Sequence, residues 1–98
     1  MVFNKHETTI IFRIVQETLT NVARHSNATD LRLSAVRKNN QFILKARDNG
    51  KGFDLDKAFK SGSLGLIGMR ERALSIGGEI LIRSKPGKGT SISLILNR

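Results

Sequence analysis

The chain has no cysteine, which excludes disulfide bonds, thiolate metal sites and a cysteine nucleophile. Tryptophan and tyrosine are absent too, and the five aromatic residues are all phenylalanine. Apolar runs are short, as in residues 42–44, so no segment has the length of a transmembrane helix. Residues 1–13 carry His6 and Glu7 and are not a secretory signal peptide. We therefore expect a cytoplasmic domain, and it stays open whether a longer parent protein is anchored in the inner or plasma membrane.

Positive charge, in contrast, is in excess: 17 lysines and arginines face 8 acidic residues, which gives a net charge of +9. The excess is spread evenly, with 8 basic and 4 acidic residues in 1–50 and 9 and 4 in 51–98. This spread favours a solvated basic surface over a dedicated nucleic-acid arm. The 98 residues, 39% hydrophobic and 26% charged, have the composition and size of one globular domain spanning residues 1–98.

Residues 5–26 are predicted to form a helix that ends at Ser26-Asn27. Asn4 is a suitable N-cap, and Glu7 three positions later completes a capping box. One arc of this helix is apolar, and we expect it to pack on the rest of the domain. The arc contains Ile11, Phe12, Val15, Leu19, Val22 and Ala23. A second, polar arc carries Glu17, Asn21, Arg24 and His25.

Four strands and two further helices follow. Alternation from Leu31 to Ala35 and from Phe42 to Asp48 predicts a hairpin that turns at Asn39-Asn40. The later elements are a short helix at 55–60, a helix at 67–76, and strands at 79–84 and 90–96. The predicted fold class is α/β: a two-layer α/β sandwich with a mixed, mostly antiparallel sheet covered on one face by helices.

Two polar residues share the phase of the apolar strand positions. Asp48 ends one strand in phase with Phe42, Leu44 and Ala46, and Thr90 begins another in phase with Ile92. Both should therefore point toward the covered face. A buried carboxylate is costly unless it is paired, so an inward Asp48 next to glycines indicates a ligand that donates hydrogen bonds.

Three motifs carry chemistry. Glu17 and Asn21 lie one helical turn apart and present two oxygen ligands of the kind that Mg²⁺ shares with phosphates, although a solvent-facing polar stripe has the same pattern. The segment 48–53, Asp-Asn-Gly-Lys-Gly-Phe, lets the backbone approach a flat ligand, and it also fits an ordinary turn. The glycines of segment 62–69 lead into a helix, whose N-terminus attracts anions, and a flexible linker is the alternative.

Together and in this order, these motifs resemble the C-terminal ATP-binding domain of sensor histidine kinases. This is the Bergerat ATP-binding fold shared with gyrase-type, Hsp90 and MutL-type mismatch-repair ATPases. Residues 13–26 are similar to the asparagine box of the subfamily that pairs with LuxR-type response regulators. The segments 48–53 and 65–72 resemble the first and second glycine boxes, and Gly87-Lys-Gly-Thr90 resembles the final Gly-x-Gly-Thr element.

The resemblance implies a role for each matching residue. Asn21 would coordinate the Mg²⁺ that bridges the ATP phosphates, and Glu17 would be the catalytic residue, acting as a base or an orienting group near the metal. Asp48 would accept a hydrogen bond from the adenine amino group, supported through water by Thr90. The other implied ATP-binding residues are Arg24 and His25 near the phosphates, Gly50 and Gly52 beside the adenine, and Gly65 and Leu66 facing phosphate. Residues 53–64 would form the ATP lid.

Departures from the family pattern limit what the chain does alone. Ser63 stands where the second glycine box often has glycine, no phenylalanine box is evident, and the usual first strand is reduced to Val2-Phe3 or missing. The family's dimerisation helices are lacking. Its phospho-accepting histidine is lacking too, because neither His6 nor His25 lies in the sequence context of such a histidine. We expect a monomeric piece that binds Mg-ATP with little turnover. Its partners would be the phospho-acceptor domain of the same protein and a response regulator, with no nucleic acid.

Two alternatives remain. Anti-sigma serine kinases share these boxes and are small domains, although Arg70-Glu71-Arg72 after the second glycine box favours a sensor kinase. The other alternative is a basic module for protein or nucleic acid with an inactive nucleotide site, which the charge of +9 supports and its even spread opposes.

Overall fold

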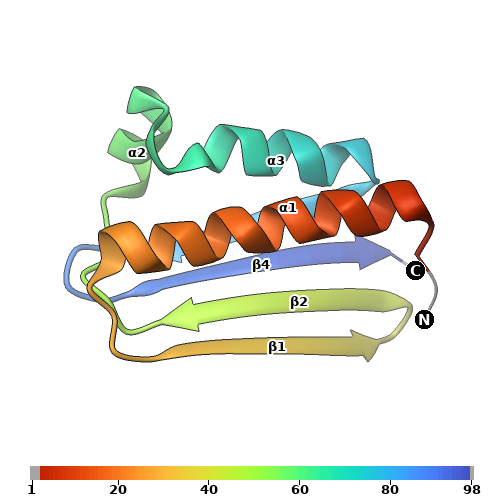
Figure 1. Ribbon diagram of the computed structural model, residues 1–98, viewed down its shortest axis with the longest axis horizontal. Helices are drawn as coiled ribbons and strands as arrows, with labels where there is room; N and C mark the ends of the chain where they lie inside the picture. The colour runs from red at the N-terminus through yellow and green to blue at the C-terminus, as the bar shows by residue number, and fades with distance from the viewer. Residues whose placement is uncertain (1–2, 98) are drawn as a thin grey trace.

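The computed structural model describes residues 3–97, which form a two-layer α/β sandwich (Figure 1). Its elements are α1 (Lys5–Asn21), the π-helical turn η1 (Val22–Ser26), β1 (Leu31–Lys38), β2 (Gln41–Asp48), α2 (Leu55–Ser61), the 3-10 turn η2 (Ser63–Gly65), α3 (Leu66–Ser75), β3 (Gly78–Ser84) and β4 (Thr90–Asn97). The strands form one sheet in the order β1-β2-β4-β3. The predicted sandwich is confirmed, and every strand pair of the described sheet is antiparallel rather than mixed.

The capping box at the start of α1 is confirmed. The side chain of Asn4 accepts a hydrogen bond from the Glu7 amide at 2.8 Å, and Glu7 Oε1 accepts one from the Asn4 amide at 3.0 Å. The predicted helix 5–26 has the expected extent, but its last five residues wind as the π-helical turn η1. The turn ends at Asn27, whose φ of 54° lies in the left-handed region.

The apolar arc predicted to seat α1 is right only in part, because three of its six residues are half-buried and Ile11 packs against the core. Phe12 is 61% exposed and Leu19 is 38% exposed, whereas Ile14 and Thr18 are buried at 2% and 5%. Thr18 is tolerated inside because its hydroxyl donates to the Ile14 carbonyl at 2.9 Å. The helix is therefore rotated about its axis, and this rotation turns Asn21, which follows Thr18 on the same face, toward the interior of the sandwich.

The β1–β2 hairpin turns at Asn39 and Asn40, as predicted. Both residues have positive φ, 53° and 61°, which is the requirement of a tight two-residue hairpin turn. The register pairs Asp48 at the end of β2 with Thr90 at the start of β4. The two polar residues that strand phase predicted to point inward are thus direct neighbours.

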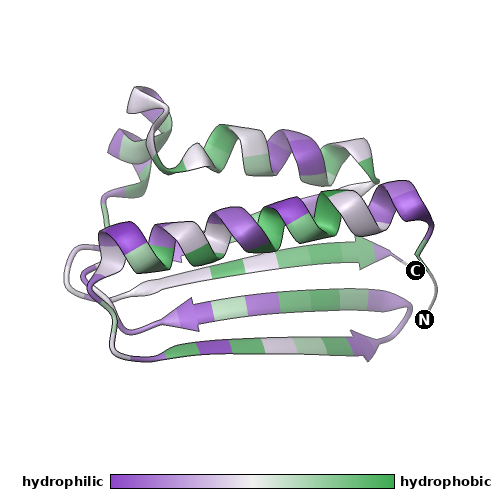
Figure 2. Cartoon of the chain, viewed as in Figure 1, coloured by the Kyte–Doolittle hydropathy of each residue, from purple (hydrophilic) through white to green (hydrophobic). Residues whose placement is uncertain are grey.

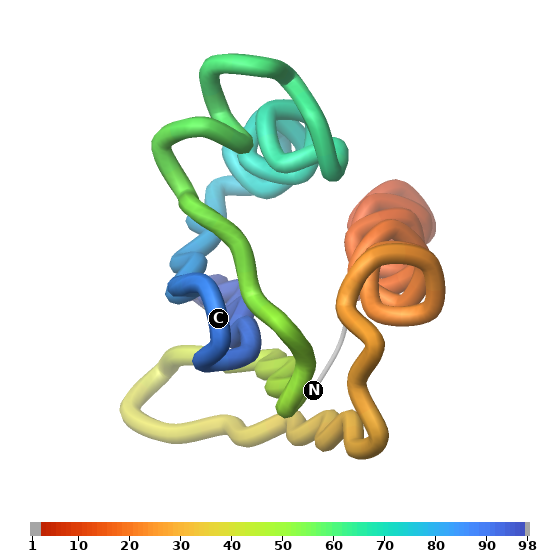
Figure 3. Tube along the Cα trace, turned by 90° about the vertical axis from the view of Figure 1, so that its left-hand side faces the viewer, coloured from red at the N-terminus to blue at the C-terminus, as the bar shows by residue number. Residues whose placement is uncertain are grey.

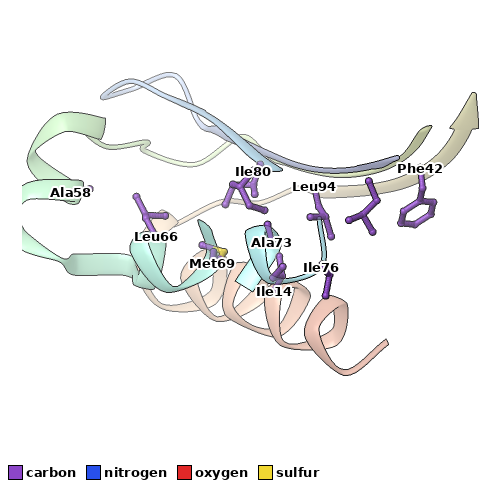
Figure 4. Packing of buried hydrophobic residues seen from close by; sticks show 11 residues of the cluster. Ile14, Phe42, Ala58, Leu66, Met69, Ala73, Ile76, Ile80 and Leu94 are labelled. Carbon is purple, nitrogen blue, oxygen red and sulfur yellow. The ribbon is translucent and has the colours of Figure 1, made fainter. Parts of the chain in front are cut away.

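Both long helices cover the same face of the sheet, as the end-on view of Figure 3 shows. Between the layers lies the core, to which α3 contributes Leu66, Met69, Ala73 and neighbouring Ile76 (Figure 4). From the sheet come Phe42, Ile80, Ile92, Leu94 and Leu96. Hydropathy alternates along part of the sheet, while β2 and β4 each contain a continuous apolar stretch, at 42–44 and 94–96 (Figure 2). The core holds the ends of α1, β2 and β4 in fixed relative positions.

The remaining predicted boundaries agree with the structure to within two residues. The usual first strand was expected to be reduced to Val2-Phe3 or to be missing, and Phe3 forms no strand. Phe3 packs edge-on against Phe42 with ring centroids 5.1 Å apart, and Val2 lies outside the described residues. In the described part of the chain, no helix combines the length and the apolar character needed to cross a membrane.

Candidate functional site

A solvent-open cavity of about 450 Å³ lies between the sheet, the C-terminal part of α1 and the segment that precedes α3. Six of the residues predicted to bind nucleotide line it: Asn21, His25, Asp48, Gly52, Leu66 and Thr90. They come from α1, η1, β2, the loop after β2, α3 and β4, so the fold brings together residues that are distant in sequence.

Asp48 is the buried carboxylate of the cavity, with 8% of its surface exposed. Its Oδ1 atom accepts a hydrogen bond from the Gly50 amide at 2.7 Å, which fixes the orientation of the carboxylate. The structure gives Oδ2 no protein donor, and no side-chain polar atom of the described residues is both buried and unpaired. Oδ2 is therefore open to the cavity as an acceptor for a ligand.

Thr90 faces Asp48 across the β2–β4 pair and belongs to a chain of hydroxyl groups. Its Oγ1 atom lies 2.8 Å from Ser84 Oγ, which also accepts from the Phe53 amide at 2.9 Å and donates to the Gly89 carbonyl at 3.2 Å. A hydroxyl group has one proton, so when Ser84 donates to Gly89 it must accept from Thr90. Sequence analysis missed Ser84, although its strand phase places it on the covered face.

Asn21 is held at the other wall of the cavity. Its side-chain amide donates from Nδ2 to the Leu64 carbonyl at 2.8 Å, which joins α1 to the predicted lid. This bond uses the nitrogen and leaves Oδ1 available as a ligand atom. Leu64, at a φ of 64°, has the strained left-handed conformation that brings its carbonyl to Asn21.

Glu17 lies one turn before Asn21 but does not line the cavity. Its carboxylate lies against Gly65, the N-cap of α3, because a Cβ added at Gly65 would lie 2.6 Å from Glu17 Oε1. Gly65 has a φ of 64° and leaves the first amides of α3 without a side-chain cap. The carboxylate and the open N-terminus of α3 are thus adjacent at the mouth of the site.

Gly50 and Gly52 are required by contacts of the chain with itself. A Cβ at Gly50 would collide with the Ser26 carbonyl, and a Cβ at Gly52 would collide with the Lys85 carbonyl. Only Gly52 has positive φ, 63°. These glycines therefore let the loop after β2 pack closely on η1 and on the β3–β4 turn, whatever ligand lies beside them.

Arg24 is exposed and, like Glu17, does not line the cavity, whereas Asn21 and His25 of the same predicted arc do. A second, wider hollow adjoins the cavity and shares His25, Gly52, Phe53 and Leu64 with it. It also contains the cations Lys51 and Lys57, which sequence analysis did not select. Lys51 lies inside the glycine segment 48–53 and Lys57 lies inside the predicted lid 53–64, and these positions were the available signal.

Apolar walls complete the cavity, and sequence analysis did not assign them to the site. Ala46 and Ile92 are buried in the strands beside Asp48 and Thr90, and Phe53 and Leu64 come from the segment predicted as a lid. Ala46 and Ile92 could have been found from strand phase, because residues two positions apart share a face. The positions of Phe53 and Leu64 depend on loop conformations that no periodic pattern predicts.

Comparison with protein families identifies the family of the chain. Residues 6–98 match the family described as histidine kinase-, DNA gyrase B- and HSP90-like ATPases. The chain belongs to this family. Among its relatives, the sensor histidine kinase LiaS of Bacillus subtilis is 50% identical over 84 residues, which is 86% of this chain and 23% of LiaS. The histidine-protein kinase/phosphatase DegS of Brevibacillus brevis is 40% identical over 90 residues, or 92% of this chain and 23% of DegS.

Solved structures agree on the fold. The histidine kinase domain of the Erythrobacter litoralis blue-light activated histidine kinase EL346 superposes with a TM-score of 0.79 at 22% identity, covering 94% of this chain and 45% of that domain. The Acinetobacter baumannii histidine kinase AdeS gives a TM-score of 0.76 at 21% identity, covering 91% of this chain and 46% of that one. The chain therefore has the ATPase-domain fold and spans about a quarter of the curated relatives it matches.

Proposed function

We propose that this chain binds ATP with Mg²⁺ in the cavity around Asp48 and, as part of a longer protein, positions the γ-phosphate for transfer to a histidine on a separate helical domain. Family membership supports ATP as the nucleotide. The kinase role is supported by relatives named sensor histidine kinases. Residues 1–98 would then form a single catalytic domain of a two-component signalling protein, with a response regulator as the next acceptor.

One observation carries the nucleotide assignment: Asp48 Oδ2 is an unpaired acceptor in a largely apolar cavity. The 6-amino group of adenine is a donor, whereas guanine presents a carbonyl oxygen at that position. A carboxylate oxygen accepts a hydrogen bond from the amino group of adenine and repels the carbonyl oxygen of guanine. Ala46, Phe53 and Ile92 supply the apolar surfaces between which a flat base packs. These features together favour adenine.

The phosphate end would lie in the wider hollow beside the cavity. His25, Lys51 and Lys57 bring donors to it, and two of these side chains carry fixed positive charge. The uncapped N-terminus of α3 at Gly65 adds backbone amides and the positive end of a helix dipole. We assign the triphosphate to this end, with Arg24 at its exposed margin.

The donor set of the site fits Mg²⁺. Among residues 3–97 no cluster of three or more His, Asp or Glu side chains forms a complete metal cage. Mg²⁺ does not need one, because it keeps several waters and shares phosphate oxygens with one or two protein ligands. Asn21 Oδ1 would be the protein ligand, with the Glu17 carboxylate nearby. When bound, the ion would supply positive charge between the phosphates.

The residues of this chain would then act by positioning. Asp48 and Thr90 hold the base, the α3 N-terminus orients the phosphates, and Phe53 and Leu64 exclude water from the base. Glu17 is assigned as the base or orienting group at the mouth of the site. Such positioning and charge neutralisation are the main contributions of a protein to phosphoryl transfer.

The transfer step is tested by adding ATP labelled at the γ-phosphate to this chain together with a helical-hairpin acceptor domain from a related kinase. We expect acid-labile, base-stable label on the acceptor, which indicates phosphohistidine. Label that resists acid would instead identify phosphoserine and favour the anti-sigma type of kinase. Glu17→Gln should bind ATP with unchanged affinity and lose the transfer.

A further inference from the structure

The face of the sheet opposite the helices is uncovered and strongly basic. Strand register places Arg32, Arg47, Ser91 and Arg83 side by side in one row across β1, β2, β4 and β3. All three arginines are exposed. Lys45 lies two positions before Arg47 on the same face, and Lys85 and Lys88 extend the charge onto the β3–β4 turn. We call these six cations, Arg32, Lys45, Arg47, Arg83, Lys85 and Lys88, the basic patch.

No ion pair neutralises the basic patch within the described residues. Among residues 3–97, none of the six cations is paired with a carboxylate. Five of them, all except Arg32, line a single hollow on this face. Arg32 and Arg47 are direct cross-strand partners, and like charges directly opposite each other destabilise a sheet. The fold thus maintains a repulsive arrangement that an anionic partner would relieve.

A group of apolar side chains lies two rows from the basic row. Toward the Asn39-Asn40 turn, the next row pairs Lys45 with Ser93 and Ser93 with Leu81. The row after that contains Val36, Ile43 and Ile95 and ends on β3 at the exposed Glu79. Val36 is 50% exposed and Leu81 is 47% exposed. We call Val36, Ile43, Leu81 and Ile95 the apolar patch. An antiparallel sheet with one solvated face usually keeps that face polar. Exposed apolar side chains close to a basic patch are instead characteristic of a surface that a partner covers.

We propose that this face binds an acidic amphipathic helix of a partner protein, laid across the strands with its carboxylates over the basic patch and its apolar side chains over the apolar patch. The outer strands of a four-stranded sheet are about 14 Å apart, which a helix of about ten residues spans. The exposed strand rows lie on the face of the sheet opposite the helices (Figures 1 and 3). The hollow lined by the five cations reaches the strand ends, where it touches Asp48 and Thr90 from outside the nucleotide cavity.

A nucleic acid fits this face less well. None of the five phenylalanines belongs to it, since Phe42 is the only one in a strand and faces the helices. Single strands bind mainly by stacking on aromatic side chains, which this face does not offer. A duplex backbone would match the basic patch but would leave the apolar patch without an apolar partner. The pairing of charge with apolar surface therefore favours a protein helix.

The test uses a fluorescent helical peptide of about twelve residues with glutamates on one side and leucines on the adjacent side. Binding to the nucleotide-free chain is followed by anisotropy at about 50 and 200 mM salt. We expect saturable binding that weakens with salt and is lost when the glutamates are replaced by glutamine. R47Q with R83Q should weaken it about tenfold, because two cross-interface charge contacts are removed. Leu81→Ser should weaken it at both salt concentrations.

Two controls make the result specific. K5Q with R13Q removes the same charge from exposed positions on α1 and should change the affinity by less than about twofold. R47Q with R83Q should keep its ATP affinity and should not lower its melting temperature, because it removes a like-charge pair rather than a packing contact. Equal peptide binding by the chain and R47Q/R83Q would overturn the proposal. So would tighter binding to a 12-base-pair duplex or to phosphatidylglycerol vesicles than to the peptide.

Discussion

Replacing Asp48 with asparagine tests the nucleotide site with little change in shape. The Gly50 amide needs an acceptor at 2.7 Å, so the oxygen of the new amide takes the place of Oδ1. The amide nitrogen must then face the cavity, where it presents two donors to the ligand. The substitution converts the free acceptor of the cavity into a donor and keeps the local backbone contact.

The size of the effect follows from the hydrogen bond that is lost. A hydrogen bond to a charged group contributes about 1.5–3 kcal/mol, which corresponds to an affinity loss of about 10- to 150-fold. The new amide donor also faces the amino group of adenine, which is another donor, and this conflict lowers the affinity for ATP further. Stability should change by less than about 1 kcal/mol, because the Gly50 bond is kept and no cavity is created in the core.

A double-mutant cycle separates this hydrogen bond from other effects. The ligands are ATP and purine riboside triphosphate, which lacks only the 6-amino group. The unmodified chain should bind ATP about 10- to 150-fold more tightly than the analogue, whereas Asp48→Asn should bind ATP no more tightly than the analogue. Calorimetry gives the four dissociation constants, and a urea melt shows that the variant is folded.

The reasoning would be refuted by a folded Asp48→Asn protein that binds ATP as tightly as the original chain. It would also be refuted if the variant discriminated ATP from the analogue as strongly as the original chain does. In either case the open oxygen of Asp48 would not contact the base.

Other substitutions test separate parts of the account. Asn21→Ala should weaken ATP binding about tenfold with Mg²⁺ and by a smaller factor in EDTA, by calorimetry; equal losses would contradict its role as a metal ligand. Gly65→Ala should reduce ATP affinity and lower the melting temperature, because its φ of 64° is strained and its Cβ would collide with Glu17. Leu94→Ala should cost about 2–5 kcal/mol in urea unfolding, since Leu94 is fully buried in the core. Asn4→Ala should cost about 0.5–2 kcal/mol by loss of the α1 cap, and an unchanged unfolding midpoint would exclude that cap as a contributor.

Strand patterns predicted the inner wall of the site well. In a strand every second residue lies on the same face. The spacing of Asp48 and Thr90 from apolar residues therefore predicts that both lie on the covered face. The structure confirms that both lie on the covered face and pair directly. The hairpin at Asn39-Asn40 was equally predictable, because few residues accept two consecutive positive φ values.

The orientation of α1 was not predictable in the same way. Hydrophobicity alone selected the arc of Phe12 and Leu19, but the buried face contains Thr18, whose hydroxyl is satisfied within the helix. A polar residue that pairs with its own backbone is treated as polar in a sequence pattern and behaves as apolar in the fold. The π-helical turn at Val22–Ser26 depends likewise on contacts outside the helix, such as the bond from the Lys51 amide to the Ser26 carbonyl.

The central claim is that the cavity around Asp48 binds an adenine nucleotide together with Mg²⁺. Calorimetric titration of the purified chain with ATP, with and without Mg²⁺, and with GTP as the control, tests it most directly. The account predicts saturable ATP binding that Mg²⁺ strengthens and GTP binding that is weaker by at least about tenfold. Absence of ATP binding by a demonstrably folded chain, or equal affinity for GTP, would contradict it.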